Sequence, residues 1–139
     1  MKRKPLLKEL NDEERTIILP LLIKLFREKT HETKHLTADV IIDKFNEKKD
    51  VIGFKSAFNK QRFMKLTNYI RAQKQLKLVS CNTGYYVSNN PEVLEECAQS
   101  LLSRIESIRA AAAGLNDMAA ELRHEASMKE VCPLGFTWD

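Results

Sequence analysis

The first 75 residues carry apolar side chains at the three- and four-residue spacing of amphipathic helices. The first predicted helix begins at Asn11, which forms a capping pair with Glu14, and ends near Lys29. Pro20 lies inside this helix and predicts a kink or a division into two short pieces. The expected core positions are Ile17, Ile18, Leu21, Leu22, Leu25 and Phe26.

Two further helices follow. Thr37 is the expected N-cap of the second helix, and Asn59 is the expected N-cap of the third, which runs to about Gln75. Residues 47–58 between them predict a loop anchored by aromatic side chains, longer than the turn of the simplest helix-turn-helix. The inward positions are Val40, Ile41 and Phe45 in the second helix and Phe63, Leu66 and Ile70 in the third.

A β-hairpin comes directly after the third helix. Residues 76–81 and 85–88 are rich in β-forming side chains and are separated by Asn82-Thr83-Gly84. Three helices followed by a hairpin is the element order of a winged helix-turn-helix. The sequence therefore predicts a mainly α fold, with a winged helix-turn-helix domain over residues 1–89.

A long helix is predicted over residues 90–126, with Asn90 as its cap and Pro91 at its first position. Its apolar residues repeat in sevens, which is typical of a coiled coil. In one of the two sets of positions that repeat every seven residues, four of the five residues are alanine. Small side chains there favour close approach of two helices, and the pairing could be antiparallel. We expect a dimer or higher homo-oligomer; in the alternative, the helix packs back on its own domain or frays. The predicted oligomerisation residues are Leu94, Ala98, Leu101, Ile105, Ile108, Ala112, Leu115, Ala119 and Leu122.

Charge is distributed unevenly along the 139 residues, whose length allows one globular core plus an extension. Residues 1–90 contain 19 Lys and Arg against 10 Asp and Glu, whereas the remainder contains 4 against 9, for a net charge of +4. Residues 51–91 contain no acidic side chain at all. This asymmetry is typical of a solvated face or of a surface that binds polyanions, and its overlap with the third helix favours polyanions.

The outer face of the third helix combines amide and cationic side chains without a carboxylate. Asn and Gln can bond an adenine edge, Arg and Lys can bond guanine, and Ala72 permits close approach to the groove. An ordinary exposed face has Glu or Asp for pairing four residues apart. We expect a recognition helix in the major groove and the hairpin on the phosphate backbone. The predicted DNA-binding residues are Lys60, Gln61, Arg62, Lys65, Asn68, Tyr69, Arg71, Lys77, Asn82 and Thr83.

Three segments carry a resemblance to known proteins. They are the third-helix stretch Phe63–Arg71 with its Asn-Tyr-Ile-Arg end, the strand Gly84-Tyr85-Tyr86-Val87-Ser88, and the helix around residues 99–105. Residues 37–115 resemble small winged-helix DNA-binding proteins of phages, prophages and related bacterial elements, which are mostly uncharacterised. The resemblance implies a transcriptional regulator or replication accessory and supplies no catalytic residues.

Several other functions are disfavoured. Catalytic motifs and a phosphate-binding glycine loop are lacking, and three cysteines without a CxxC pair argue against a zinc knuckle or disulfide framework. His31 and His35 lack a third metal ligand nearby, so we expect no enzyme, cofactor, metal or membrane insertion. The expected compartment is the cytoplasm of a bacterial or phage-infected cell. The tail, residues 127–139, is expected to dock a protein partner or fold back on the oligomer. The alternative function is a winged-helix adaptor that uses this tail and the long helix.

Overall fold

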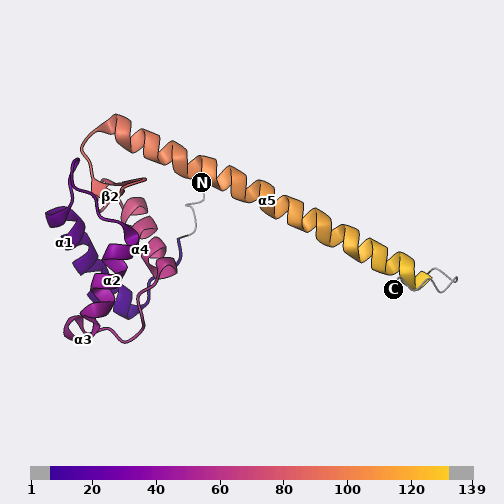
Figure 1. Cartoon of the computed structure of the whole chain (residues 1–139), viewed down its shortest axis with the longest axis horizontal. Helices are drawn as coiled ribbons and strands as arrows, with labels where there is room; N and C mark the ends of the chain where they lie inside the picture. The colour runs from indigo at the N-terminus through magenta and orange to yellow at the C-terminus, as the bar shows by residue number, and fades with distance from the viewer. Residues whose placement is uncertain (1–6, 132–139) are drawn as a thin grey trace, which may run out of the picture. The chain divides into compact units, whose positions relative to one another are not determined.

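The computed structural model describes residues 7–131, apart from the side chains of residues 129–131. It confirms a mainly helical chain with one antiparallel hairpin and a long C-terminal helix (Figure 1). The chain divides into two compact units, residues 1–97 and 98–139. The elements are the π-helix η1 (Glu14–Ile18), α1 (Leu19–Lys29), α2 (Ala38–Glu47), α3 (Lys49–Ile52), α4 (Lys60–Ala72), β1 (Leu78–Cys81), β2 (Gly84–Val87) and α5 (Pro91–Val131).

The first helical segment begins with the predicted reciprocal cap. The Glu14 amide donates to Asn11 Oδ1 at 2.8 Å, and the Asn11 amide donates to Glu14 Oε1 at 3.0 Å. The segment is then divided near Pro20, because η1 is π-helical and α1 is α-helical. The Leu19 amide bonds the Glu14 carbonyl, five residues back. The hydrogen-bond ladder has therefore already shifted by one residue at Pro20, which has no N–H to donate.

The core of the N-terminal unit lies between α1, α2, α4 and the hairpin. Phe63 is its centre, since its ring meets those of Phe26, Phe58 and Tyr85 at centroid distances of 6.4, 6.2 and 5.0 Å. The predicted α4 stripe is confirmed as fully buried, whereas Leu21 of α1, also expected in the core, is 38% exposed. The fully buried hydrophobic side chains, at 0% exposure, are Ile18, Leu22, Phe26, Ile41, Phe63, Leu66 and Ile70.

The inward face of α2 differs from its prediction at one position. Thr37 caps the helix as expected by accepting a hydrogen bond from the Val40 amide at 3.3 Å. Val40 itself is 44% exposed, and Ile42 is buried in its place. The buried set Ile41, Ile42 and Phe45 occupies one arc of the helix, and Val40 lies outside that arc.

The connection from α2 to α4 is anchored by Phe54 and Phe58, as predicted, and both rings are buried. The Asn46 side chain fixes its end, because Asn46 Nδ2 donates to the Phe58 carbonyl and Oδ1 accepts from the Phe58 amide. The short helix α3 inside this connection was not predicted. Asn59 then caps α4 by accepting from the Arg62 amide at 2.8 Å.

The hairpin pairs β1 with β2 around the two-residue turn Asn82-Thr83. Leu36, just before α2, adds a single antiparallel bridge to Tyr85, with N–H to O distances of 3.0 and 2.7 Å. Gly84 permits this bridge. Its φ is +130°, and a Cβ there would lie 2.5 Å from the Leu36 carbonyl oxygen.

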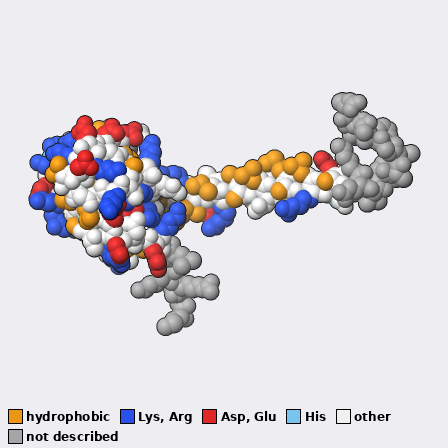
Figure 2. All heavy atoms as spheres, turned by 90° about the horizontal axis from the view of Figure 1, so that it is seen from below, with side chains coloured by type: hydrophobic (Ala, Val, Ile, Leu, Met, Phe, Trp, Pro, Cys, Tyr) orange, Lys and Arg blue, Asp and Glu red, His pale blue; other side chains and the backbone are white. Residues whose placement is uncertain are grey.

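Helix α5 continues to Val131, five residues beyond the predicted end, and its 41 residues span about 62 Å. Figure 2 shows hydrophobic side chains in a line along one side of it. Leu94 and Leu101 are half-buried, and the other predicted oligomerisation residues are exposed. No helix within residues 7–131 is long and apolar enough to cross a membrane. The rest of the predicted docking tail, residues 132–139, lies outside the described residues.

Replacing Gly84 by Ala is expected to destabilise the N-terminal unit by more than about 2 kcal/mol, because the new methyl group meets the Leu36 backbone. Gly53→Ala is the matched control. Gly53 also has a positive φ, +97°, but has open space around its Cβ position, so only about 1 kcal/mol is expected. Urea denaturation of both variants measures the difference, and equal losses would contradict the close approach.

Candidate nucleic-acid interface

The exposed surface of α4 is formed by Gln61, Asn68 and Ala72. Lys60 at the start of the helix is also exposed, with its Nζ 3.9 Å from Asp39 Oδ1 of α2. Tyr69 is half-buried and packs against the core. The amide side chains of the predicted face are therefore available to a ligand, and α4 contributes no carboxylate beside them.

A hollow of about 400 Å³ lies along this surface. Four of its lining residues come from α4, and Leu7 and Lys8 come from the segment that precedes the first helix. The structure thus brings three predicted residues together around one concavity and adds Lys8 to them. The lining residues are Leu7, Lys8, Gln61, Met64, Lys65 and Asn68.

Two predicted DNA-binding cations, Arg62 and Lys65, are bound to a buried carboxylate. The Glu14 side chain is fully buried, and its Oε1 accepts from Lys65 Nζ at 2.6 Å while its Oε2 accepts from Arg62 Nε at 3.1 Å. Glu13 Oε1 lies 3.3 Å from the same guanidinium, which also donates to the backbone carbonyls of residues 56 and 57. The carboxylate-free segment of the sequence therefore meets two carboxylates in the folded chain.

Glu14 remains ionised in this position. Burial raises its pKa, but the hydrogen bonds from Lys65, the Asn11 amide and Arg62 outweigh burial, so the net pKa lies below the ordinary value of 4.5. The pKa of Glu13 is also lowered, first by the hydrogen bond from the Lys55 amide.

The sequence contained a signal for this buried carboxylate. Glu14 precedes Ile18 by one helical turn and so shares the inward side of the first helix. Glu14 therefore acts both as the capping partner of Asn11 and, through its carboxylate, as the buried partner of Arg62 and Lys65.

Arg71 connects α4 to the hairpin. Its Nε donates to the Leu78 carbonyl at 2.9 Å, a terminal nitrogen donates to Ser80 Oγ at 3.2 Å, and the guanidinium lies 5.7 Å from the centre of the Tyr85 ring. This predicted DNA-binding residue therefore holds the hairpin against α4. Its replacement would disturb the fold as well as any contact with phosphate.

The turn of the hairpin exposes Asn82 and Thr83. The Thr83 hydroxyl lies 2.6 Å from Nδ1 of His35, whose ring stacks on Tyr86 at 3.9 Å. The Cys81 thiol lies 3.0 Å from the same hydroxyl. The hydrogen bonds from the side chain and backbone of Thr83 lower the pKa of Cys81 and outweigh the opposing effect of burial. His35 thus braces the turn, and residues 7–131 hold no cluster of three metal-ligating side chains.

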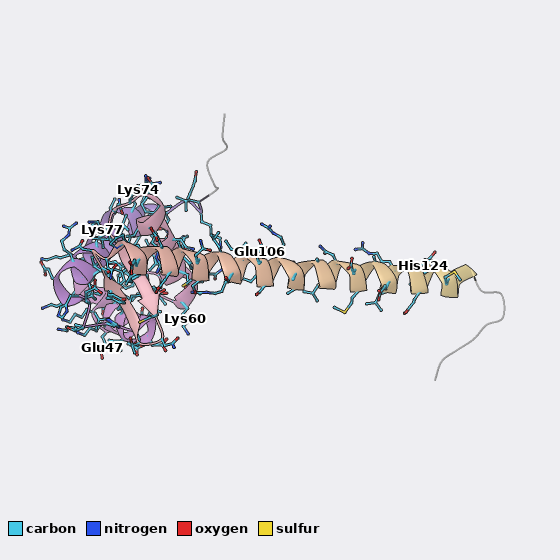
Figure 3. The ribbon with its side chains drawn as sticks, turned by 90° about the horizontal axis from the view of Figure 1, so that it is seen from above. Glu47, Lys60, Lys74, Lys77, Glu106 and His124 are labelled. Carbon is cyan, nitrogen blue, oxygen red and sulfur yellow. The ribbon has the colours of Figure 1, made fainter. Side chains whose placement is uncertain are left out.

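The remaining predicted cation, Lys77, is exposed and donates to Asn89 Oδ1 at 3.1 Å. Lys74 in the preceding turn is exposed as well, and in the view of Figure 3 both Lys74 and Lys77 lie on the other side of the N-terminal unit from Lys60. On the face seen in Figure 2, acidic side chains lie among the Lys and Arg of the N-terminal unit. The exposed cations therefore flank the two ends of α4, and the amide side chains lie between them.

Comparisons with protein families, curated proteins and solved structures find no match to this chain. The resemblance to winged-helix proteins of phages and prophages stays a prediction from the sequence.

Replacing Glu14 by Gln is expected to lower the free energy of unfolding by about 3 kcal/mol at pH 7, because two partly buried cations lose their carboxylate. In the unaltered chain this contribution is complete above pH 4.5 and is lost as the pH falls through the lower folded-state pKa. Urea denaturation at pH 7 and pH 3 should therefore show a smaller acid-induced loss for Glu14→Gln.

Asp12→Asn provides the control. Asp12 pairs with Arg15 at the surface, with 93% of the Asp12 side chain exposed, so its replacement should change stability by less than about 0.5 kcal/mol. A loss in Asp12→Asn as large as that in Glu14→Gln would show that burial of the Glu14 carboxylate is not the cause.

Proposed function

We propose that the N-terminal unit is a winged helix-turn-helix that binds duplex DNA, with α4 in the major groove and the hairpin beside the phosphate backbone. The observation that carries the proposal is the exposed face of α4, where Gln61 and Asn68 present two amide side chains next to the small Ala72. Amides of this kind can make paired hydrogen bonds to an adenine edge.

The topology supports this reading of the fold. The chain runs from α1 through the bridged residue Leu36 to α2 and α4, and then into β1 and β2. The Leu36–Tyr85 bridge gives the hairpin a third, single-residue strand from the segment between the first two helices. Helix α1, the bridge at Leu36, helices α2 and α4 with the short α3 between them, and the hairpin follow one another in an order compatible with a winged helix.

The charged contacts in this proposal come from fewer residues than the sequence predicted. Lys60, Lys74 and Lys77 are exposed at the two ends of α4, and Lys8 lines the hollow on its outer face. These lysines would bind phosphates and position the unit, whereas the amides would read bases. Arg62 and Lys65 orient the helix from within through Glu14, and Arg71 holds the hairpin, so these three would act mainly by positioning.

The expected ligand is double-stranded DNA, in the cytoplasm of a bacterial or phage-infected cell. A role in transcription or in replication is equally compatible with the same contacts. Self-association through α5 would join two such units, and the binding free energies of two half-sites then add.

Selection of bound duplexes from a random pool, followed by fluorescence anisotropy on the selected site and a scrambled site, tests the proposal. Asn68→Ala and Gln61→Ala should each reduce the affinity ratio between the two sites by about 10-fold, since a lost paired contact is worth about 1–3 kcal/mol. Lys74→Gln and Lys77→Gln should weaken both sites alike and should each lower the slope of log affinity against log salt by about 1.

Lys44→Gln is the matched control, because Lys44 is exposed but lines a different hollow with Leu21 and Leu25 of α1. It should change neither the ratio nor the slope by a comparable amount. Absence of salt-dependent binding, or equal effects of Lys44→Gln and Lys74→Gln, would overturn the assignment of this face.

A further inference from the structure

Helix α5 exposes a row of large apolar side chains within the C-terminal unit. Ile105, Ile108, Leu115 and Leu122 are 47, 67, 64 and 65% exposed. Together with the alanines between them they form one line, which we call the seam. The seam consists of Ala98, Leu101, Ile105, Ile108, Ala112, Leu115, Ala119, Leu122 and Ala126.

We propose that the seam binds the seam of a second copy of this chain as an antiparallel two-stranded coiled coil, with Ala112 opposite Leu115 of the second copy. This inference rests on α5 alone and does not require that the N-terminal unit bind DNA. Two observations support it, the sizes of the seam residues and the charges beside them.

Residue size favours the antiparallel orientation. In a parallel pair each seam residue faces its own copy, so four layers of alanine lie among five layers of leucine or isoleucine. The alanine layers need the helix axes close together and the leucine layers need them farther apart, and one helix pair cannot satisfy both without voids.

The antiparallel register removes this conflict. Ala112 faces Leu115, Ala119 faces Ile108 and Ala126 faces Leu101, so each of these layers combines one small and one large side chain. Only the layer of Ile105 with Leu122 joins two large residues. The separation of the two helix axes therefore stays nearly constant along the seam, and the large side chains fill the space beside the alanines.

The flanking charges favour the same orientation. In the antiparallel register Arg104 of each helix faces Glu125 of the other, which forms two attractive pairs for each dimer. In a parallel pair Arg104 would instead face Arg109, which forms two repulsive pairs. Charges at these flanking positions set the orientation of coiled coils. The parallel arrangement loses the two attractive pairs and gains two repulsive pairs.

The charges also select the register. Sliding one helix by a single heptad in one direction places Arg109 against Arg109 of the second copy. Sliding it in the other direction places Arg109 against Arg123. In the register with Ala112 opposite Leu115, Arg109 faces the neutral Asn116.

Analytical ultracentrifugation of charge variants tests the orientation. Arg104→Glu and Glu125→Arg should each raise the dimer Kd roughly 10-fold or more, because two attractive pairs become repulsive. The double variant restores opposite charges and should return the Kd to within about 3-fold of the unaltered chain. Arg109→Glu is the control. It makes the same charge change opposite Asn116 and should shift the Kd by less than about 3-fold.

A parallel dimer gives the opposite signs. There, Arg104→Glu and Arg109→Glu would each replace repulsion by attraction and tighten association. Tighter association of these two variants would overturn the proposal. So would a chain that remains monomeric at about 50 µM, a concentration at which a Kd in the micromolar range is resolved.

Disulfide cross-linking gives an independent test in a full-length chain whose three native cysteines are replaced by serine. A mixture of Ala126→Cys and Leu101→Cys proteins should form a mixed disulfide under oxidising conditions, because these two positions share a layer. Ala126→Cys alone should form none, since the two copies of residue 126 lie about 38 Å apart along the coil. A self-disulfide of Ala126→Cys without the mixed product would show parallel pairing instead.

Discussion

The buried carboxylate of Glu14 is the interaction on which the arrangement of the N-terminal unit depends. A buried charge is tolerated only when it is paired and fully hydrogen-bonded, and Glu14 has the Asn11 amide, Lys65 and Arg62 as donors. These contacts fix the start of the first helix to the middle of α4, far away in the sequence. They also fix the rotation of α4 about its axis. Burial of the apolar stripe favours the same rotation, with the stripe toward the core and Gln61 and Asn68 outward.

Local signals in the sequence were sufficient for most elements of this unit, although not for the short helix α3. The spacing of apolar residues predicted the helices, and the three caps at Asn11, Thr37 and Asn59 form as expected because each depends on atoms within three residues. The two β-rich runs likewise predicted the hairpin. The error at Val40 arose because Val40 and Ile42 are both β-branched and apolar, and only the packing of the neighbouring helices decides which of them is covered.

The charged surface could not be predicted in the same way. A stretch without acidic residues indicates a cationic surface only if no acidic residue from elsewhere in the chain packs against it. Glu13 and Glu14 do so, and the contact depends on the tertiary path that brings the first helix onto α4. The same path places Leu7 and Lys8 beside Gln61, a neighbourhood for which the linear sequence gave no indication.

In the proposed DNA complex, the contacts that Arg62, Lys65 and Arg71 make within the fold leave fewer cations for the duplex. Most of the affinity for a duplex comes from cations that displace counterions from phosphates, and here only a few exposed lysines remain near α4 for that purpose. A single unit would then discriminate through its amides but bind weakly. Joining two units raises the effective concentration of the second at its half-site without further positive charge. Because residues 1–97 precede the seam in both copies, an antiparallel pair attaches its two units at opposite ends of the coil.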